Sequence, residues 1–328
     1  MTRKPLVTVV SSYYNRRDFV TESVRSLLEQ TYENLEIIIV DDGSSDDTTE
    51  MLRALGSDPR LKIISQENKG LVKTFIDVIR EAQGELIAIH GSGDISFPTR
   101  IEKQVALLTA HDDIGVVGCH VEQTDYVRGT SYTLRRDLHG DIRALLKRQN
   151  VYTHGEVMFK KDVYERAGGY REFFKYAQDY DLWLRMSEHT GFSVVKEVLY
   201  RRYFLPDGVS RSAQKTVTQR YLFDFAAQCA AMKDKIGRDL LDIHGPQAGF
   251  YRERSKRTAT MLWRLAITHL VRQNLSEAQL CNEASLREVR GLRNTLTRTG
   301  LTLAKRYDAV ASLLFRTLST LKRVRRGG

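Results

Sequence analysis

Acidic and polar residues follow three of the apolar runs in the first third of the chain. Ser12 and Tyr14 come after the first run, Asp41-Asp42 follows the second, and Asp94 follows a later one. Further along, Asp179 lies at the start of a stretch with helical spacing. Carboxylate oxygens accept hydrogen bonds, can take a proton from a reacting hydroxyl, and are the ligands that hard divalent cations need. These residue types are therefore suited to three functions: ligand binding, proton transfer and metal binding.

An alternation of strand and helix patterns must position these residues. Apolar, β-branched runs predict buried strands at Leu6–Ser11, Leu35–Val40, Leu61–Ser65 and Leu86–His90. Helical spacing between them predicts helices at Phe19–Gln30 and Gly70–Ala82, and a further helix that begins near Thr48. A fourth helix is expected over Ile95–Ala110, a range that contains Pro98. This order indicates parallel strands joined by crossover helices, whose ligands bind at the carboxyl ends of the strands. Ser12, Tyr14, Asp41, Asp42 and Asp94 all fall at those ends.

The remaining patterns divide the chain into two parts. More strands are expected at Gly115–Val127, His154–Lys161 and Phe192–Phe204, and an amphipathic helix at Gln178–Glu188 with Leu182, Trp183 and Met186 inward. From Thr216 onward helical patterns dominate. We therefore expect a domain over residues 1–215 and a basic helical region over residues 216–328.

Composition excludes several classes of protein. The 328 residues are 41% hydrophobic and carry a formal net charge of +10, which rules out a disordered or collagen-like chain. The three cysteines are far apart, so a disulfide framework and a cysteine zinc site are not expected. No signal peptide and no run of about 18 apolar residues is evident. We expect a cytoplasmic location.

The positive charge is concentrated in the last third of the chain. Residues 216–328 hold 21 Lys and Arg against 9 Asp and Glu, whereas residues 1–215 hold 30 against 32. Such a basic block prefers an anionic partner, and the alternative is a solvated helical surface.

Four groups of residues, taken in order, resemble the family 2 glycosyltransferases with the GT-A fold. They are VVSSYYNRRDFVTESVRSLLEQTYENLEIIIVDDGSSDDT from Val9, Gly84-Glu85, Pro98 with Arg100, and Gly168-Gly169-Tyr170 with Asp179-Tyr180-Asp181-Leu182-Trp183-Leu184-Arg185. The resemblance covers about residues 5–212. It implies an α/β, Rossmann-like fold with a mixed, mostly parallel sheet flanked by helices, here followed by a helical C-terminal extension. It also implies inverting transfer from a UDP- or dTDP-type sugar to a hydroxyl of a saccharide or lipid-linked acceptor in cell-surface polysaccharide synthesis.

The same resemblance assigns roles to individual residues. Asp42 matches the aspartate that hydrogen-bonds the nucleotide base, Asp41 supports its turn, and Ser12 and Tyr14 match contacts to the base and ribose. The alternative for the two aspartates is a turn and helix cap.

On the acceptor side, Asp179 matches the catalytic base, preceded by Gln178 where the family usually has Glu. The alternative for Asp179 is an N-cap on the helix that follows. His154 lies where the family approaches the acceptor, and it is either a hydroxyl-orienting residue or an ordinary half-buried histidine.

The chain departs from the family at the end of the fourth strand. The family's Asp-x-Asp-Asp is Gly91-Ser92-Gly93-Asp94 here, so Gly93 replaces the aspartate that binds Mg²⁺ or Mn²⁺. Phe204 stands where the family often has a metal-binding histidine. Three alternatives follow. Asp94 holds the metal alone; or cationic side chains stabilise the diphosphate without metal, the candidates being Lys73, Arg100, Arg201 and Arg202; or the protein is a non-catalytic nucleotide-sugar-binding or scaffold protein. Because Asp42, Asp94 and Asp179 are all present, a working transferase is favoured.

The C-terminal third has helical patterns at Ala248–His269 and Ala278–Arg290. Beyond them, apolar residues from Leu303 to Val324 recur every three or four positions among many Lys and Arg. Such a basic amphipathic helix over residues 301–326 fits an anionic membrane surface, so the protein is expected to be peripheral at the inner face of the membrane. The alternative is a helix packed on the domain or on a second subunit. No base-reading module is visible, so no nucleic-acid partner is expected.

Overall fold

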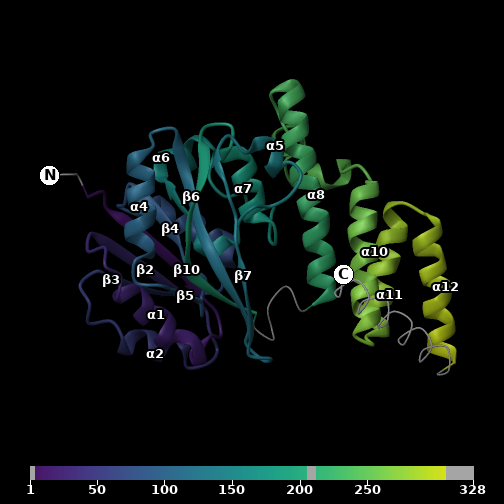
Figure 1. The fold of residues 1–328 in the computed structure, drawn as a ribbon, viewed down its shortest axis with the longest axis horizontal. Coiled ribbons are helices and arrows are strands. Elements are labelled where there is room, and N and C mark those ends of the chain that lie inside the picture. The colour runs from purple at the N-terminus through teal and green to yellow at the C-terminus, as the bar shows by residue number, and fades with distance from the viewer. Residues whose placement is uncertain (1–3, 205–211, 308–328) are drawn as a thin grey trace. The chain divides into compact units, whose positions relative to one another are not determined.

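The computed structural model describes residues 4–204 and 212–307, which fall into two compact units that divide at Pro206–Asp207 (Figure 1). The first unit is an α/β unit built on one mixed sheet. The described part of the second unit, residues 212–307, consists of helices and their connections. Each is described by itself.

The sheet of the first unit has the strand order β3-β2-β1-β4-β9-β6-β10-β5, with β7 paired to β6 and β8 paired to β10. The strands are β1 (Val7–Tyr13), β2 (Leu35–Asp42), β3 (Leu61–Gln66), β4 (Leu86–Ile89), β5 (Ile95–Ser96), β6 (Ile114–Asp125), β7 (Thr130–Leu134), β8 (His139–Gly140), β9 (Met158–Lys160) and β10 (Gly191–Phe204). The strands β1 to β4 are parallel to one another, and β10 is parallel to β6. The short strands β5, β8 and β9 run antiparallel to their neighbours. The predicted mixed, mostly parallel sheet is therefore confirmed.

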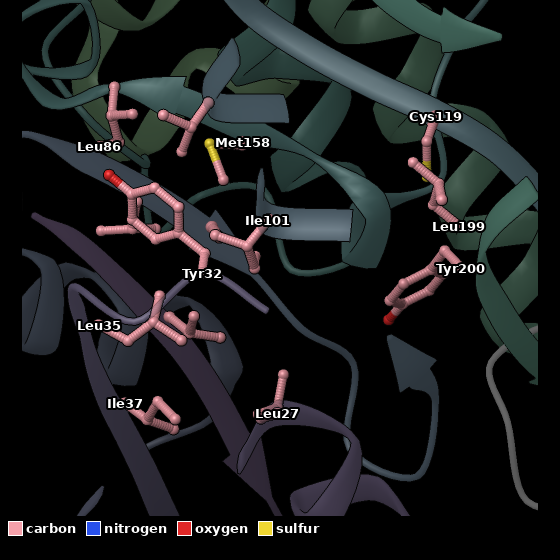
Figure 2. Packing of buried hydrophobic residues seen from close by; sticks show 14 of the residues in the cluster. Leu27, Tyr32, Leu35, Ile37, Leu86, Ile101, Cys119, Met158, Leu199 and Tyr200 are labelled. Carbon is pink, nitrogen blue, oxygen red and sulfur yellow. The ribbon is translucent and has the colours of Figure 1, made fainter. Parts of the chain in front are cut away.

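Helices cover both faces of this sheet (Figure 1). They are η1 (Arg17–Phe19), α1 (Val20–Leu28), α2 (Thr48–Ala54), α3 (Leu71–Glu81), α4 (Arg100–Ala110), α5 (Arg143–Leu146), η2 (His154–Glu156), α6 (Lys161–Arg166) and α7 (Gln178–Met186). Apolar residues of α1, α2 and α4 pack with alternate residues of the strands into one buried cluster (Figure 2). The apolar residues of α3, which contacts β1 and β2, are not part of that cluster, so α3 covers the opposite face.

Burial of aliphatic side chains on both faces explains why the central strands form. In β1 and β2, successive residues such as Val9, Val10, Ile38 and Ile39 are almost completely buried, as expected for parallel strands covered by helices on both sides. Removing this much apolar surface from water is the main stabilising term of the unit. The result is a rigid platform whose strands end at one edge.

Three segments differ from the sequence expectations. Strand β1 continues through Tyr13, whose ring is buried. Ile95–Ser96 is not helical but forms β5, because these residues pair antiparallel with Tyr200 and Arg201 of β10. His154–Glu156 is a 3-10 turn rather than the start of a strand, because Thr153 and Glu156 form a capping box across it.

The second unit consists of α8 (Ala213–Ile236), α9 (Leu240–His244), η4 (Gly245–Tyr251), α10 (Lys256–Val271), α11 (Leu275–Glu288) and α12 (Leu292–Arg306). The helices α8, α10 and α11 pack around Val217, Leu262 and Cys281. Arg252 is half-buried and pairs with two carboxylates, Asp224 and Glu288, and so ties the segment before α10 to α8 and α11. Among the described helices, none is long and apolar enough to span a bilayer.

The predicted basic amphipathic helix over residues 301–326 lies mostly outside the described residues. Only its first residues are described, and they belong to α12. Leu301 of that segment is buried, whereas Leu303 is exposed.

Candidate active site at the carboxyl edge of the sheet

The ends of β1 and β2 bring four of the predicted site residues together. Tyr13 lies opposite Asp41 in the parallel register, so Ser12 and Tyr14 lie next to Asp41 and Asp42. Ser12 is half-buried, and Tyr14 is exposed. Both loops that follow the strands are joined by Asn15, whose side-chain oxygen accepts the Ser45 N–H at 2.8 Å. These residues form one wall of the site.

Asp41 and Asp42 are both buried, and their carboxylates hold the backbone around them. Asp41 accepts hydrogen bonds from Ser44 and from the Thr49 hydroxyl, which supports the turn after β2. Asp42 accepts from the N–H groups of Lys69 and Gly70, both at 2.9 Å, and so fixes the loop that leads into α3. The positioning of this loop is a task of Asp42 that sequence reasoning missed.

The segment Gly91–Asp94 is braced against β10. The Tyr200 hydroxyl donates to Asp94 Oδ2 at 2.7 Å and accepts the Gly91 N–H at 2.9 Å. The Tyr203 N–H donates to Asp94 Oδ1 at 3.0 Å. Burial raises the pKa of Asp94 to about 6, although the nearby charge of Arg202 opposes that shift. Both carboxylate oxygens of Asp94 therefore serve to hold this segment in place.

A chain of buried side chains runs behind the segment. The Tyr13 hydroxyl donates to Ser23 at 2.8 Å, Ser23 contacts His90 Nε2 at 3.0 Å, and His90 Nδ1 contacts Ser96 at 3.1 Å. Burial lowers the pKa of His90 to about 3, so the ring is neutral at physiological pH. The chain ends at Arg100, which donates to Ser96 at 2.8 Å.

Arg100 is the first correction to the predicted site. Its side chain has no exposed surface, and its guanidinium also donates to the Ile89 carbonyl at 2.8 Å and to Gln104 at 3.2 Å. The ring of Tyr200 lies against it. These contacts hold the guanidinium inside the fold, so Arg100 is a buried structural residue and not a diphosphate ligand.

The other predicted cationic residues lie on β10, where Arg201 and Arg202 point to opposite faces, and on α3, which carries Lys73. Arg201 points away from Asp94 and forms an ion pair with Glu122 at 2.7 Å, so it is also removed from the predicted diphosphate group. Arg202 lies on the side of Asp94, and its charge acts on the pKa values of Asp94, His154 and Glu156. On α3, Lys73 is half-exposed and paired with Asp77 at 2.9 Å.

Asp179 lies in the first turn of α7. The N-cap of this helix is Ala177, so the alternative role of Asp179 as N-cap is wrong. Its Oδ2 accepts the side-chain amide of Asn150 at 2.9 Å. The neighbouring Asp181 points into the fold, where Arg171 and Arg185 bind its carboxylate. The two aspartates of this helix therefore differ: Asp179 is half-buried, whereas Asp181 is buried and holds two arginines of the fold.

His154 contacts both helix α3 and the segment that precedes α7. Its Nε2 lies 2.6 Å from the Tyr170 hydroxyl, and its ring packs against Phe75 of α3 at a centroid distance of 5.5 Å. Burial lowers the pKa of His154, and the charge of Asp179 opposes that shift.

Asp42 reaches the same place through the Thr74 hydroxyl at 3.2 Å, next to Phe75. The charges of Asp179 and Arg202 both act on the pKa of His154, and that of Arg202 also acts on the pKa of Asp94.

Several residues of this set were missed by sequence reasoning. They are Asn150, Tyr170 and Tyr200, together with the buried pair of Glu156 and Arg136, whose atoms Oε1 and Nη1 lie 2.9 Å apart. Burial raises the pKa of Glu156 to about 8 despite the opposing charge of Arg136. Only the Thr153–Glu156 spacing, typical of a capping box, offered a signal in the sequence.

The described residues at this edge offer a divalent cation few ligands. In the described part of the chain, no three His, Cys, Asp or Glu side chains gather in a way that could hold a metal ion. Asp94 is the one carboxylate of the Gly91–Asp94 segment, and both its oxygens accept hydrogen bonds from β10. Mg²⁺ at nucleotide sites is usually held by one or two carboxylates together with waters and substrate phosphates, and in this segment Asp94 is the carboxylate on offer. Phe204 ends β10 and lies under the Arg202 guanidinium.

Comparisons with known proteins agree with the fold. A family model described as "Glycosyl transferase family 2" matches residues 8–168. The chain is 32% identical over 210 residues to the "Putative glycosyltransferase EpsE" of Bacillus subtilis (strain 168), which covers 61% of this chain and 74% of EpsE. It is 30% identical over 189 residues to the "O-antigen biosynthesis glycosyltransferase WbnJ" of Escherichia coli, which covers 55% of this chain and 71% of WbnJ. Three further relatives are matched over 62% to 64% of their length.

A solved structure extends the likeness over almost the whole chain. The mannosyltransferase PcManGT from Pyrobaculum calidifontis, in complex with GDP-Man and Mn²⁺, matches with a TM-score of 0.53 and 20% identity. The match covers 99% of this chain and 87% of that protein. At this identity the likeness concerns the fold, which is the GT-A fold predicted from the sequence.

Proposed function

The chain belongs to glycosyl transferase family 2, and from this premise we propose that it transfers a sugar, with inversion, from a UDP- or dTDP-type donor to a hydroxyl group. The observation that supports the proposal is that Ser12, Asp42 and Asp94 follow the parallel neighbouring strands β1, β2 and β4, while the charges of Asp179 and Arg202 act on His154. Binding sites at strand ends of α/β sheets are built in this way.

In this proposal Asp179 is the general base. Asn150 donates to its Oδ2, which leaves Oδ1 to accept the proton of the acceptor hydroxyl. The acceptor oxygen bonds to the anomeric carbon as the bond to the diphosphate breaks, and the nucleoside diphosphate leaves with the bonding electrons. A base positioned in this way contributes about 10²- to 10⁴-fold to a rate.

The donor is held on the wall formed by β1 and β2. Ser12 and Tyr14 are accessible enough to contact the base and ribose, and Asp42 fixes the backbone of Lys69 and Gly70 beside them. His154, close to Asp179 and held by Tyr170, is placed to orient the acceptor hydroxyl. The neutral ring can accept or donate one hydrogen bond at each nitrogen.

The acceptor is proposed to be a saccharide or a lipid-linked saccharide of a cell-surface polysaccharide. The name of WbnJ, which refers to O-antigen biosynthesis, supports this class. The exposed face of α12 supports a location at the inner face of the membrane, because Leu292, Leu296 and Leu303 are exposed and lie on one side of the helix. They belong to the region that carries 21 Lys and Arg against 9 Asp and Glu, which favours anionic head groups.

Release of nucleoside diphosphate from a panel of UDP-, dTDP- and GDP-sugars tests the proposal, first as hydrolysis and then with saccharide acceptors. We expect release with the wild type and a loss of at least ~10²-fold with Asp179→Asn. Equal rates for the two proteins would remove Asp179 from the mechanism. The remaining alternative, a non-catalytic nucleotide-sugar-binding or scaffold protein, predicts no release with any donor.

A further inference from the structure

We propose that this protein binds the diphosphate of its nucleotide sugar without a divalent cation, and that the guanidinium of Arg202 supplies the positive charge. The inference rests on the proposed function, since it concerns the same donor. It deepens that function by naming the group that neutralises the leaving diphosphate. The argument has three steps, which concern the glycines, Asp94 and Arg202.

The first step is that the Gly91–Asp94 segment has no room for further carboxylates. A Cβ atom on Gly91 would lie 2.3 Å from Asp94 Oδ2, because the Asp94 side chain folds back over this residue. Gly93 has a φ of +94°, a conformation that side chains other than glycine rarely adopt, and its Cβ would meet Phe19 Cβ at 3.1 Å. The backbone is thus shaped for glycine at both positions, and the loss of acidic ligands is part of the structure of the loop.

The second step is that Asp94 is committed to β10. Its two oxygens accept hydrogen bonds from Tyr200 and from the Tyr203 N–H, and the residue is half-buried. Each oxygen keeps a free lone pair, but the two hydrogen bonds fix the direction in which the carboxylate points. Swinging the side chain out towards a cation would break both bonds, at a cost of about 1 to 3 kcal/mol for each group left unpaired. In its observed position Asp94 therefore stabilises the segment.

The third step concerns the charge that remains. Arg202 alternates with Arg201 along β10, so that Arg201 pairs with Glu122 while Arg202 lies near Asp94 and His154. Arg202 is half-exposed, and its guanidinium lies over the ring of Phe204. Within the described residues, the guanidinium forms no hydrogen bond or ion pair. A guanidinium presents several N–H donors in a fixed plane, which suits two phosphate oxygens at once.

Isothermal titration calorimetry with UDP, dTDP and GDP tests the inference, in EDTA and in excess Mn²⁺. We expect the preferred nucleotide to bind the wild type with the same Kd in both buffers. We expect Arg202→Gln to raise that Kd by about 10- to 100-fold, because a charge-assisted contact is lost. Arg202→Lys should recover part of the affinity, since the charge stays and the planar fork is lost.

Arg201→Gln is the matched control, because it removes the same charge from the neighbouring residue on the opposite face. Its Kd should stay within about 2-fold of the wild type, and thermal unfolding of each variant verifies that it is folded. Binding that requires Mn²⁺ would overturn this inference while leaving the proposed function intact. Wild-type affinity in Arg202→Gln would overturn the role of Arg202. No binding of any nucleotide in either buffer would overturn the proposed function as well.

Discussion

The side-chain amide of Asn150 donates to Oδ2 of Asp179 at 2.9 Å, and the Asn150 carbonyl oxygen accepts the Tyr152 N–H at 3.3 Å. Asn150 thereby links the first turn of α7 to the segment that leads into η2. Among the described residues, Asn150 is the one whose side chain donates a hydrogen bond to this carboxylate. The orientation of the proposed base thus depends on a residue 29 positions earlier in the chain.

Replacing Asn150 by Ala should lower kcat by about 10-fold and leave the KM for the donor unchanged, because the base loses its orientation while the donor wall is intact. Steady-state kinetics at varied donor concentration measures the two constants separately. Asn150→Asp, which places a second carboxylate against Asp179, should lower kcat further. An increase in donor KM without a change in kcat would contradict a positioning role.

Replacing Asp179 by Asn should reduce kcat by about 10²- to 10⁴-fold, because the amide cannot take the acceptor proton. The affinity for the nucleoside diphosphate should stay within about 2-fold, since Asp179 belongs to α7, whereas Ser12 and Asp42, which are proposed to hold the nucleotide, end β1 and β2. Turnover assays combined with calorimetry separate the two effects. A loss of nucleotide affinity equal to the loss of kcat would show that Asp179 acts in binding.

Replacing Asp181 by Asn should instead reduce the stability of the fold. Its buried carboxylate binds Arg171 and Arg185, and removal of one partner of a buried ion pair costs about 3 to 5 kcal/mol. Chemical denaturation measures this difference, with Asp179→Asn as the control that should change the free energy of unfolding by about 1 kcal/mol or less. Similar stabilities for the two variants would contradict the separation of roles along α7.

Much of the first unit could be predicted because its strands are short apolar runs and its helices have regular spacing. The runs of Leu35–Val40 and Leu86–His90 correspond to β2 and β4, and the helical spacing of Gln178–Glu188 corresponds to α7. The two-residue strand β5 could not be predicted, because it owes its conformation to pairing with β10 about 100 residues later. The residues next to β5 in the sequence do not indicate that it pairs with β10.

The same limit applies to the site. That Asp41, Asp42 and Asp94 follow strands was evident from the sequence, since strand ends meet at one edge of a parallel sheet. That Arg100 turns inward was not evident, because its partners Ser96, Gln104 and the Ile89 carbonyl are ordinary residues of the fold. The role of Asp94 depends on Tyr200, more than 100 residues away.

The raised pKa of Asp94 predicts a measurable pH dependence. The carboxyl has a pKa of about 6 in the fold and 3.8 as its ordinary value, so the folded state binds the proton more tightly. Stability attributable to this group is therefore present at low pH and is lost as the pH rises from about 4 to about 6. Relative to Asp94→Asn, the wild type should lose up to about 2 to 3 kcal/mol over this window. Urea denaturation at several pH values measures the difference, and parallel curves would contradict it.

Exposed leucines of α12 should mediate attachment to anionic membranes. Replacing Leu292, Leu296 and Leu303 together by Ser should weaken binding to phosphatidylglycerol vesicles by at least about 10-fold, because each leucine contributes apolar burial at the interface. Sedimentation with vesicles at low and high salt measures this, and phosphatidylcholine vesicles test the need for negative charge. The control is Val127→Ser with Ile236→Ser, which removes exposed apolar surface elsewhere. Unchanged sedimentation of the triple variant would exclude α12 as the attachment site.

The bracing of Gly91–Asp94 has a consequence for attempts to alter donor choice by engineering. Gly91 and Asp94 are fastened to Tyr200, and the Gly93 N–H donates to Ser23 at 3.2 Å, so substitutions here propagate into the interior instead of reshaping a surface. Diversity introduced by directed evolution will be tolerated better at Lys69 and Lys73, whose side chains are partly exposed. Libraries that keep the glycine segment fixed and randomise such positions are the ones from which new donor preferences should emerge.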